Sequence, residues 1–309
     1  MKSSMPLGNQ ILVRPLLSIS RQMIIDYANE YQLAWVEDES NTDTRFDRNF
    51  IRHQIIPLLS ERWPSIQSTI NRSASHCLEA QTLLDELAEQ DLAKIKLTET
   101  SLQVSLLITL SKARFNNLIR FFLSQHNCLM PSTEQLLQVR LQLLANSDKN
   151  PEVKVGDYFL RRFKDSLQLT SSFIDITDWQ QVIDLSAKVV DITLPDNLGQ
   201  LLCTTKESKT VTSQRIRLAE VGQVVSIRFS HNNPKCLPDY RQHSRSLKKV
   251  LQELDIAPWQ RKRTVFLYYD EDLVAVIGHF VCQSYIANDN EPCLYVDKTS
   301  SSQHSLKQK

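Results

Sequence analysis

Glycine is scarce in this sequence and widely spaced. The 309 residues contain only five glycines, Gly8, Gly156, Gly199, Gly222 and Gly278, and no two of them lie near each other. Loops that surround phosphate groups need glycine, because backbone N–H groups must approach the anion closely. No GxGxxG, GxxxxGK or SGG-type loop occurs in the chain. The sequence therefore excludes nucleotide binding through such a loop within these residues.

Motifs for metal binding, disulfide frameworks and membrane insertion are also missing. The six cysteines show no CxxC spacing and no paired Cys/His spacing, which argues against a zinc site or a disulfide framework. No apolar run reaches the roughly 20 residues of a membrane span, and Met1 to Gln10 do not resemble a signal peptide. We therefore expect a soluble cytoplasmic protein with no metal site, no membrane partner and cysteines that act as small buried residues.

The numbers of positive and negative residues are nearly equal, and the chain has no motif for nucleophilic catalysis. Lys and Arg number 36 against 35 Asp and Glu, for a net charge of +1. A basic surface, if there is one, must therefore be local. No HExxH or GxSxG motif occurs, and aromatic residues at 7% form no RNA-stacking motif. The distribution of charge along the chain is thus more informative than its sum.

The first 64 residues have the pattern of part of an α/β domain. Leu12 to Leu17 is predicted to be a strand, a helix capped by Ser18 or Ser20 follows, and Leu33 to Val36 is a second short apolar stretch. From Arg48 the pattern is helical as far as Pro57, which should end or kink the helix. One such unit cannot bury both faces of a parallel sheet, so the chain is expected to begin inside a domain.

Residues 65–170 are predicted to form a helical domain with a small β appendage. Apolar positions at steps of three and four predict a long helix from Ile66 to Ile95. Leu102 to Leu107 has a strand-like pattern. Two more helices follow, the second of which opens with a capping box at Ser132 to Gln135. The helices are predicted at 112–125 and 133–145, and a hairpin or small sheet is predicted at 153–169.

The rest of the chain is predicted to be β-rich. Residues 171–210 are polar and weakly periodic, which is typical of a linker with extra strands. Residues 211–297 contain four apolar β-type runs, at 215–218, 224–229, 265–269 and 273–277, together with one helix from Arg245 to Leu254. Residues 298–309 form a polar tail that we expect to be disordered. The predicted fold class is α+β and multidomain.

Two arginines near residue 50 are candidates for binding a nucleotide or phosphate. Arg48 and Arg52 are four residues apart and share a helix face that follows an acidic segment. That face could grip phosphates. Alternatively, Asp47 caps the helix and the arginines pair with the acidic segment before it. The spacing alone leaves both interpretations open.

A second candidate region lies between Arg228 and Arg263. It contains nine Lys or Arg against three Asp or Glu, a local excess of six in a chain that is close to neutral. Within it, the helix Arg245 to Leu254 has an apolar stripe on one side and Arg245, Lys248 and Lys249 on the other. Such a surface suits contacts with the phosphates of a nucleic acid, although a solvated charged face would look the same. Arg161, Arg162 and Lys164 form a third, weaker cluster.

Two ordered blocks of the sequence resemble one known family. The first is LVRPLLSISRQMIIDYANEYQLAWVEDESNTDTRFDRNFIRHQIIPLLSERWP, at 12–64, and the second is LKKVLQELDIAPWQRKRTVFLYYDEDLVAVIGHFVC, at 247–282. Their RPLL, WVEDESN and DRNFIR motifs are similar to the closing part of the catalytic domain of tRNA(Ile)-lysidine synthetases. The second block resembles the C-terminal domain of that family. The resemblance extends over nearly the whole chain.

The resemblance implies a fold plan and a reaction. It implies a remnant of a PP-loop ATPase-like catalytic domain at 1–64, a helical substrate- and tRNA-binding domain at 65–170, and a small α+β tRNA-binding domain at 211–297. In this family ATP adenylates the C2 carbonyl oxygen of the wobble cytidine, position 34, in a tRNA(Ile) with a CAU anticodon. The ε-amine of free lysine then displaces AMP. The complete enzyme is a carbon–nitrogen ligase that uses ATP and magnesium.

The resemblance also assigns residues, and the missing glycine loop limits what they can do. Arg48, Asn49 and Arg52 match a motif that borders the family's active site. The implied tRNA-binding residues are Arg245, Lys248, Lys249, Arg261, Lys262 and Arg263. The family's SGGxDS loop is not present in these residues, so they are expected to be inactive alone and to bind neither ATP nor magnesium. The alternatives are a non-catalytic tRNA-binding module and one subunit of a split enzyme, with an N-terminal catalytic fragment or a second copy as partner.

Overall fold

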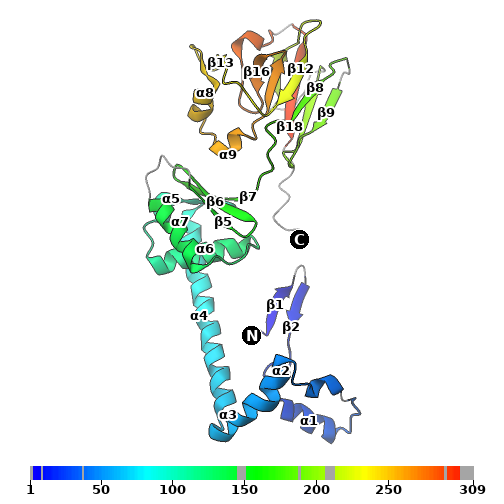
Figure 1. The fold of residues 1–309 in the computed structure, drawn as a ribbon, viewed down its shortest axis with the longest axis vertical. Helices are drawn as coiled ribbons and strands as arrows, with labels where there is room; N and C mark the ends of the chain where they lie inside the picture. The colour runs from blue at the N-terminus through cyan, green and yellow to red at the C-terminus, as the bar shows by residue number, and fades with distance from the viewer. Residues whose placement is uncertain are drawn as a thin grey trace. The chain divides into compact units, whose positions relative to one another are not determined.

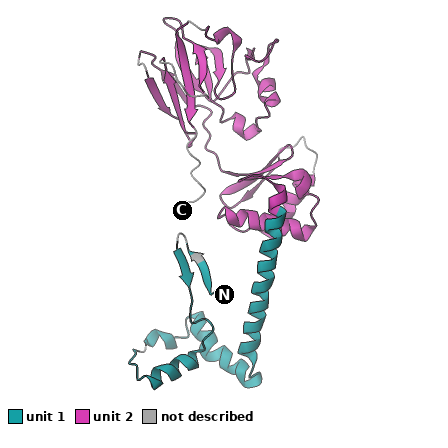
Figure 2. Ribbon diagram, turned by 180° about the vertical axis from the view of Figure 1, so that it is seen from behind, with its two compact units in different colours: residues 1–91 teal, residues 92–309 magenta. Residues whose placement is uncertain are grey.

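The computed structural model describes residues 3–7, 10–36, 38–144, 151–186, 189–205, 213–288 and 291–299 (Figure 1). Backbone contacts divide the chain into two compact units, residues 1–91 and residues 92–309, which Figure 2 shows in different colours. Elements of both kinds occur in each unit, so the chain is a mixed α and β protein as the sequence predicts. None of the described helices is both long and apolar enough to cross a membrane.

Unit 1 begins with a hairpin instead of the predicted strand–helix–strand pattern. Strands β1 (Ser4–Leu7) and β2 (Gln10–Val13) pair antiparallel. The predicted strand at 12–17 is wrong beyond Val13, because Pro15 has no N–H for a ladder and the chain turns there. The helix is confirmed as α1 (Arg21–Glu30), and its cap is Ser20, whose Oγ accepts from the Met23 N–H at 3.2 Å.

The second predicted strand of this unit is also wrong. Residues 33–36 have no regular secondary structure. A strand is stable only when a neighbour satisfies its backbone groups, and the described part of unit 1 supplies no strand beside them. Apolar content at 33–36 therefore does not by itself produce a strand.

The helix that starts after Phe46 contains a π turn. It consists of α2 (Asp47–Phe50), a π-helical turn (Ile51–Ile55) and α3 (Ile56–Arg62). The Ile56 N–H donates to the Ile51 carbonyl, five residues back. Pro57 was predicted to end or kink the helix. It instead sits in the first turn of α3, where a proline is tolerated because its missing N–H disturbs the helix least. The π turn absorbs the disturbance immediately before it.

The long helix predicted after Pro64 is α4 (Ile66–Ile95). Most of its apolar positions in unit 1 are exposed, including Ile70 at 49% and Leu84 at 43%. Burial is concentrated in the last two turns, at Ala88, Leu92 and Ile95. The last of these turns enters the core of unit 2.

Unit 2 begins with an antiparallel five-stranded sheet and three helices. The strand order is β3 (Lys96–Thr98), β4 (Ser101–Gln103), β7 (Ser166–Ser171), β6 (Tyr158–Phe163) and β5 (Glu152–Val155). Figure 1 shows helices α6 (Lys112–Gln125) and α7 (Thr133–Leu144) beside this sheet, with the short α5 (Val104–Leu107) nearby. Phe115, Leu118 and Phe122 are fully buried between the layers. We call residues 92–171 the middle lobe.

Local sequence signals located the helices of the middle lobe well. The Ser132 N–H donates to Gln135 Oε1 at 2.8 Å, and the Gln135 N–H donates to Ser132 Oγ at 3.2 Å, so the capping box is confirmed. The hairpin or small sheet predicted at 153–169 is confirmed as a small sheet, in which β6 pairs with β5 and β7. The expected end of the second helix at Ala145 lies outside the described residues.

The strand predicted at 102–107 ends early for a long-range reason. Asp165 accepts hydrogen bonds from the Ser105 N–H at 2.6 Å and from Ser105 Oγ at 2.8 Å. These bonds give a backbone N–H group at the start of α5 a hydrogen-bond acceptor, and the chain continues as a helix after Gln103. The partner is 60 residues away in the sequence, so no local pattern could indicate it.

The rest of unit 2, which we call the C-terminal lobe (residues 172–299), contains two main sheets. One has the order β11 (Gln214–Arg217), β18 (Cys293–Thr299), β10 (Gln200–Thr204) and β9 (Val189–Thr193). The other has the order β17 (Phe280–Val281), β16 (Asp272–Val276), β15 (Phe266–Tyr269), β12 (Val225–Arg228) and β8 (Gln180–Ile183). Apolar side chains from both sheets share one core.

A small layer of short elements packs on the second sheet. It consists of the ribbon β13 (Lys235–Cys236) and β14 (Arg245–Ser246), and helices α8 (Leu247–Glu253) and α9 (Pro258–Arg261). Leu247, Val250 and Leu251 of α8 are buried against Phe266 and Phe280 of the sheet. The predicted apolar stripe of this helix is therefore confirmed, and its opposite face is free to carry charge.

Two predictions about the C-terminal lobe need correction. Residues 171–210 were predicted to be a linker with extra strands, but β8, β9 and β10 are members of the two main sheets. β8 and β9 are edge strands, each with a single buried residue, which explains their weak apolar pattern. The predicted disordered tail at 298–309 is wrong for Lys298 and Thr299, which belong to β18. Residues 300–309 lie outside the described residues.

Candidate functional site

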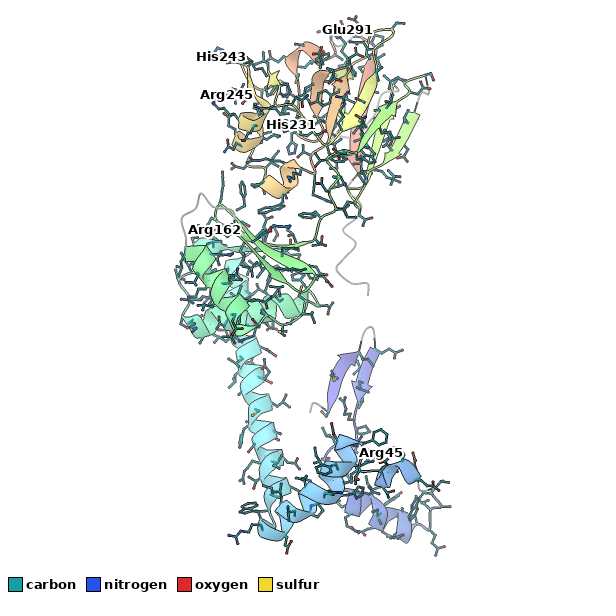
Figure 3. The ribbon with its side chains drawn as sticks, viewed as in Figure 1. Arg45, Arg162, His231, His243, Arg245 and Glu291 are labelled. Atoms are coloured by element: carbon teal, nitrogen blue, oxygen red, sulfur yellow. The ribbon has the colours of Figure 1, made fainter. Side chains whose placement is uncertain are left out.

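The first candidate site is the acidic turn that precedes α2. Asp38 accepts the Ser40 N–H at 2.9 Å and starts a 3-10 turn over Glu39–Thr42. Asp43 is paired with Arg45, which is labelled in Figure 3, at 2.7 Å. Hydrogen bonds from the Arg45 side chain hold the pKa of the Asp43 carboxyl below its usual value. Glu37, the first acidic residue of the motif, lies outside the described residues.

Asn49 fixes this turn to the helix. Its side chain is 8% exposed, and Nδ2 donates to the carbonyls of Ser40 at 2.8 Å and Asp43 at 3.0 Å. His53 Nε2 lies 2.9 Å from the Asn41 carbonyl, which can only accept, so the ring nitrogen donates. The acidic turn is therefore tied to the helix at three carbonyls. Asn49 therefore holds the acidic turn in place and adds no charge to the site.

Arg48 and Arg52 are not occupied by the acidic turn. Arg48 is exposed and Arg52 is half-buried. Within the described residues neither side chain makes a hydrogen bond or an ion pair, whereas Asp43 is taken by Arg45. The helix cap is Phe46, with no side-chain capping bond, so Asp47 does not cap the helix. Within the described residues, the alternative in which the turn neutralises these arginines is not what the structure shows, and both guanidinium groups are available to an anion.

Two of the six predicted RNA-binding residues have roles inside the protein. Arg263 is ion-paired with Asp196, donates to the Asp196 carbonyl at 3.0 Å and lies 4.4 Å from the Phe173 ring centroid. Its side chain is only 13% exposed. Arg261 Nε donates to the Ile256 carbonyl at 2.8 Å, and burial lowers the pKa of this arginine. Both residues hold the segment around α9 in place.

The remaining four, Arg245, Lys248, Lys249 and Lys262, are exposed, and we call them the basic face of the lobe. Arg245, labelled in Figure 3, shares Glu253 with Arg241 and contacts it at 2.8 Å. The side chains of Lys248, Lys249 and Lys262 are exposed, and within the described part of the chain they make no hydrogen bond or ion pair. We call Lys248 and Lys249 the α8 lysine pair. Their ammonium groups are available for phosphate oxygens without breaking any contact shown here.

The third cluster from the sequence is structural. Arg161 is 8% exposed and pairs with Glu152 at 3.0 Å. Arg162 donates to the carbonyls at the end of α7, with 2.9 Å to the Leu143 carbonyl. Lys164 is ion-paired with Asp255. These side chains join elements of unit 2 and are not arranged as a surface for phosphates.

Sequence reasoning missed a small pocket in the C-terminal lobe. It has a volume of about 80 Å³ and is lined by Arg228, Ser230, His231, Asn232, Pro234, Tyr268 and Glu271. The residues come from two segments about 40 positions apart in the sequence. Only the polar turn Ser230 to Pro234 gave a local signal, and nothing in the sequence placed Tyr268 or Glu271 beside it.

The described residues contain neither a cluster of metal-ligating side chains nor a glycine-rich phosphate loop. They contain no group of three or more His, Cys, Asp or Glu side chains that could hold a metal ion. Their glycines with positive φ, at 156, 199, 222 and 278, are isolated turns and not a phosphate-binding loop. In unit 1 the described residue with positive φ is Gln32, far in sequence from both arginines.

Three domain families match separate parts of the chain. Residues 1–59 match a PP-loop domain, residues 102–168 match the TilS substrate binding domain, and residues 225–298 match the TilS substrate C-terminal domain. The three matches follow the same order as the N-terminal unit, the middle lobe and the C-terminal lobe. The chain therefore matches a PP-loop domain at its N-terminal part and two TilS domain families after it.

Curated relatives that match this chain over almost its whole length are tRNA(Ile)-lysidine synthases. The tRNA(Ile)-lysidine synthase of Photobacterium profundum is 39% identical over 291 residues, covering 94% of this chain and 65% of the relative. That of Yersinia pseudotuberculosis serotype O:1b is 37% identical over 308 residues, covering 96% and 67%, and that of Serratia proteamaculans is 40% identical over 286 residues, covering 92% and 63%. The chain spans about two thirds of the length of these relatives. It belongs to the tRNA(Ile)-lysidine synthase family.

Proposed function

We propose that this chain contributes the tRNA-holding part of a tRNA(Ile)-lysidine synthase. The proposed reaction of the complete enzyme joins lysine to C2 of wobble cytidine 34 in the tRNA(Ile) whose anticodon is CAU. The C2 oxygen attacks the α-phosphorus of ATP and pyrophosphate leaves. The lysine ε-amine then attacks C2 and AMP leaves with that oxygen. The observation that carries the tRNA-holding role is the α8 lysine pair, exposed and unengaged on a domain that matches the family's substrate C-terminal domain.

The proposal gives each part of the chain a task. Residues 1–64 belong to a PP-loop catalytic domain, in which Arg48 and Arg52 lie close to the nucleotide and Asn49 holds the turn beside them. Residues 65–170 and 211–297 bind the tRNA. The matches at 1–59, 102–168 and 225–298 support this plan. We propose a cytoplasmic location, magnesium as the companion of ATP, and either a catalytic fragment or a second copy of the chain as partner.

A non-catalytic tRNA-binding module is the second candidate. It would use the exposed α8 lysine pair to hold the tRNA without any ATP-dependent step. Both candidates share the tRNA-binding role of the C-terminal lobe. They differ in whether a partner restores catalysis, and not in what the α8 lysine pair does.

Exchanging the α8 lysine pair for glutamine should weaken tRNA binding by removing phosphate contacts. For the double variant Lys248→Gln and Lys249→Gln, we expect the dissociation constant to rise about tenfold near 0.1 M salt. The slope of log affinity against log salt should become shallower by about 1.5, because each lysine–phosphate contact releases roughly one counterion. Fluorescence anisotropy with labelled tRNA(Ile) over a salt series measures both quantities.

A charge-conserving variant separates charge from packing in this experiment. Lys248→Arg together with Lys249→Arg keeps both positive charges and should retain the salt slope. If the glutamine variant binds as tightly as the parent chain, with the same salt slope, the basic face is not the RNA contact. If the parent chain binds no tRNA at all, the proposed function itself fails.

The 309 residues alone should not activate cytidine. In an assay of ATP–pyrophosphate exchange with tRNA(Ile), we expect a rate equal to that of a blank without protein. The reason is that the chain offers no backbone loop for the triphosphate. The full-length Photobacterium profundum relative, in the same buffer, is the positive control. Exchange above the blank by the purified chain would contradict this part of the proposal.

A further inference from the structure

The pocket beside the basic face takes no part in the proposed contacts between lysines and phosphates. It lies between the turn 230–234, which follows β12, and the residues Tyr268 and Glu271 at the β15–β16 hairpin. Its volume of about 80 Å³ exceeds the roughly 10–15 Å³ that one buried water needs on the same kind of measure. The space is therefore large enough for part of a small polar molecule or for the edge of a larger one.

One wall of the pocket consists of an ion pair and an aromatic ring and has no net charge. The Arg228 guanidinium lies 4.7 Å from the Tyr268 ring centroid and pairs with both oxygens of Glu271, at 3.1 and 3.2 Å. Arg228 also donates to the Asp270 carbonyl at 2.9 Å. Because its N–H groups are engaged, the arginine has few donors left for a phosphate. The Glu271 carboxylate would also repel a phosphate. This wall favours a neutral ligand that can donate a hydrogen bond to the carboxylate.

The opposite wall is a turn with a fixed histidine. The His231 ring contacts Phe266 edge-on, with centroids 5.2 Å apart, and its position is labelled in Figure 3. His231 Nδ1 accepts the Asn233 N–H at 3.0 Å. Burial lowers the pKa of His231, which keeps the ring neutral near pH 7. The proton of the neutral ring is therefore on Nε2, which is a hydrogen-bond donor.

Two further polar groups of the turn have no protein partner. Ser230 and Asn232 are exposed, and in the described residues their side chains make no hydrogen bond. Together with His231 Nε2 and Glu271 they offer both donors and acceptors around one small space. Mixed donors and acceptors without net charge are the complement of a base edge or a ribose hydroxyl.

The turn is also linked directly to the basic face. Asn233 has a positive φ of 52°, and its Oδ1 accepts the backbone N–H of Lys248 at 2.8 Å. The residue that shapes the pocket thus also anchors the first turn of α8. An RNA strand whose phosphates contact the α8 lysine pair would pass within reach of the pocket.

We propose that this pocket receives the sugar or base edge of one nucleotide of the RNA held by the α8 lysine pair. Ser230 and Asn232 contact the nucleotide directly, and Arg228 and His231 position the walls. The inference rests on the proposed tRNA-binding function and adds a neutral contact to it. The lysines supply affinity that depends on salt, and the pocket supplies affinity that does not.

The test is the double variant Ser230→Ala and Asn232→Ala in the full chain. Both residues are exposed, so thermal unfolding should be unchanged. We expect the dissociation constant for tRNA(Ile) to rise about 3- to 10-fold, as for the loss of one or two hydrogen bonds, with the salt slope of the parent chain preserved. Gln252→Ala is the matched control, because it removes an exposed amide from α8 outside the pocket and should bind as the parent does.

A DNA copy of the tRNA sequence identifies which edge enters the pocket. If the pocket holds a ribose hydroxyl, the double variant should bind the DNA copy as tightly as the parent chain does. If it holds a base edge, the loss should persist on DNA. Unchanged binding of both nucleic acids by the double variant overturns the proposal, as does a loss that comes with a shallower salt slope. A parent chain that fails to bind tRNA overturns the proposed function and this inference together.

Discussion

Replacing Phe266 by alanine should lower the free energy of unfolding of unit 2 by about 3–5 kcal/mol. Phe266 is fully buried on β15, packed against Leu247, Val250 and Leu251 of α8, and its ring also contacts His231. The truncation leaves a cavity between the sheet and the helix that carries the α8 lysine pair. Chemical denaturation followed by circular dichroism measures the change. A second readout is tRNA binding, which should weaken because the helix loses its support.

Val182 provides a control on the same sheet. It lies on β8 and is 64% exposed, so Val182→Ala should change the free energy of unfolding by less than about 0.5 kcal/mol. If Phe266→Ala were as mild as Val182→Ala, α8 would not depend on the buried face described here. The two substitutions remove apolar atoms from two strands of one sheet and differ mainly in burial.

Replacing Arg161 by alanine should cost unit 2 about 2–4 kcal/mol. The guanidinium lies within 6 Å of the ring centroids of Phe159, Phe173 and Trp259, and its Nη1 donates to Thr170 Oγ1 at 2.6 Å. Most of the loss should come from these contacts. The Glu152 carboxylate is 57% exposed and can return to water, so the broken ion pair contributes little. Denaturant titration gives the value.

Two variants refine the interpretation of this result. Arg161→Lys keeps the charge but loses the planar group that stacks on the rings, so it should remain destabilised. Lys164→Ala removes an exposed ion pair with Asp255 from the adjoining turn and should cost no more than about 1 kcal/mol. Full stability of Arg161→Lys would show that charge, and not stacking, is the stabilising property.

The predictions that succeeded depended on local signals. The capping box at Ser132 and the apolar periodicity of α6 act within a few residues, so the sequence located both helices of the middle lobe. The buried strands β12, β15 and β16 were found because each is a short apolar run bounded by polar turns. The edge strands β8 and β9 were missed because only one residue of each is buried. Their other residues have the weakly periodic pattern of a linker.

The candidate sites were predictable only in outline. The count of basic residues located the charged region, but it could not show that Arg263 is held by Asp196, 67 residues away. It also could not distinguish the engaged Arg261 from the exposed Lys262. The motif around residue 50 singled out Asn49, while its role as the anchor of the acidic turn became visible only with the carbonyls of Ser40 and Asp43 in place.

The π turn at 51–55 determines where the helix that runs from α2 to α3 can lose a single residue. A π turn is an α-helix with one inserted residue, and each residue of an α-helix advances by about 100° around the axis. Deleting one residue within the π turn would leave an ordinary α turn, and α3 would keep its orientation relative to Arg48. Deleting a residue elsewhere in the helix would instead rotate everything after it by about 100° relative to Arg48. The π turn is therefore a place where this helix can lose a residue while Arg48 and the face that α3 offers to its neighbours keep their relative orientation.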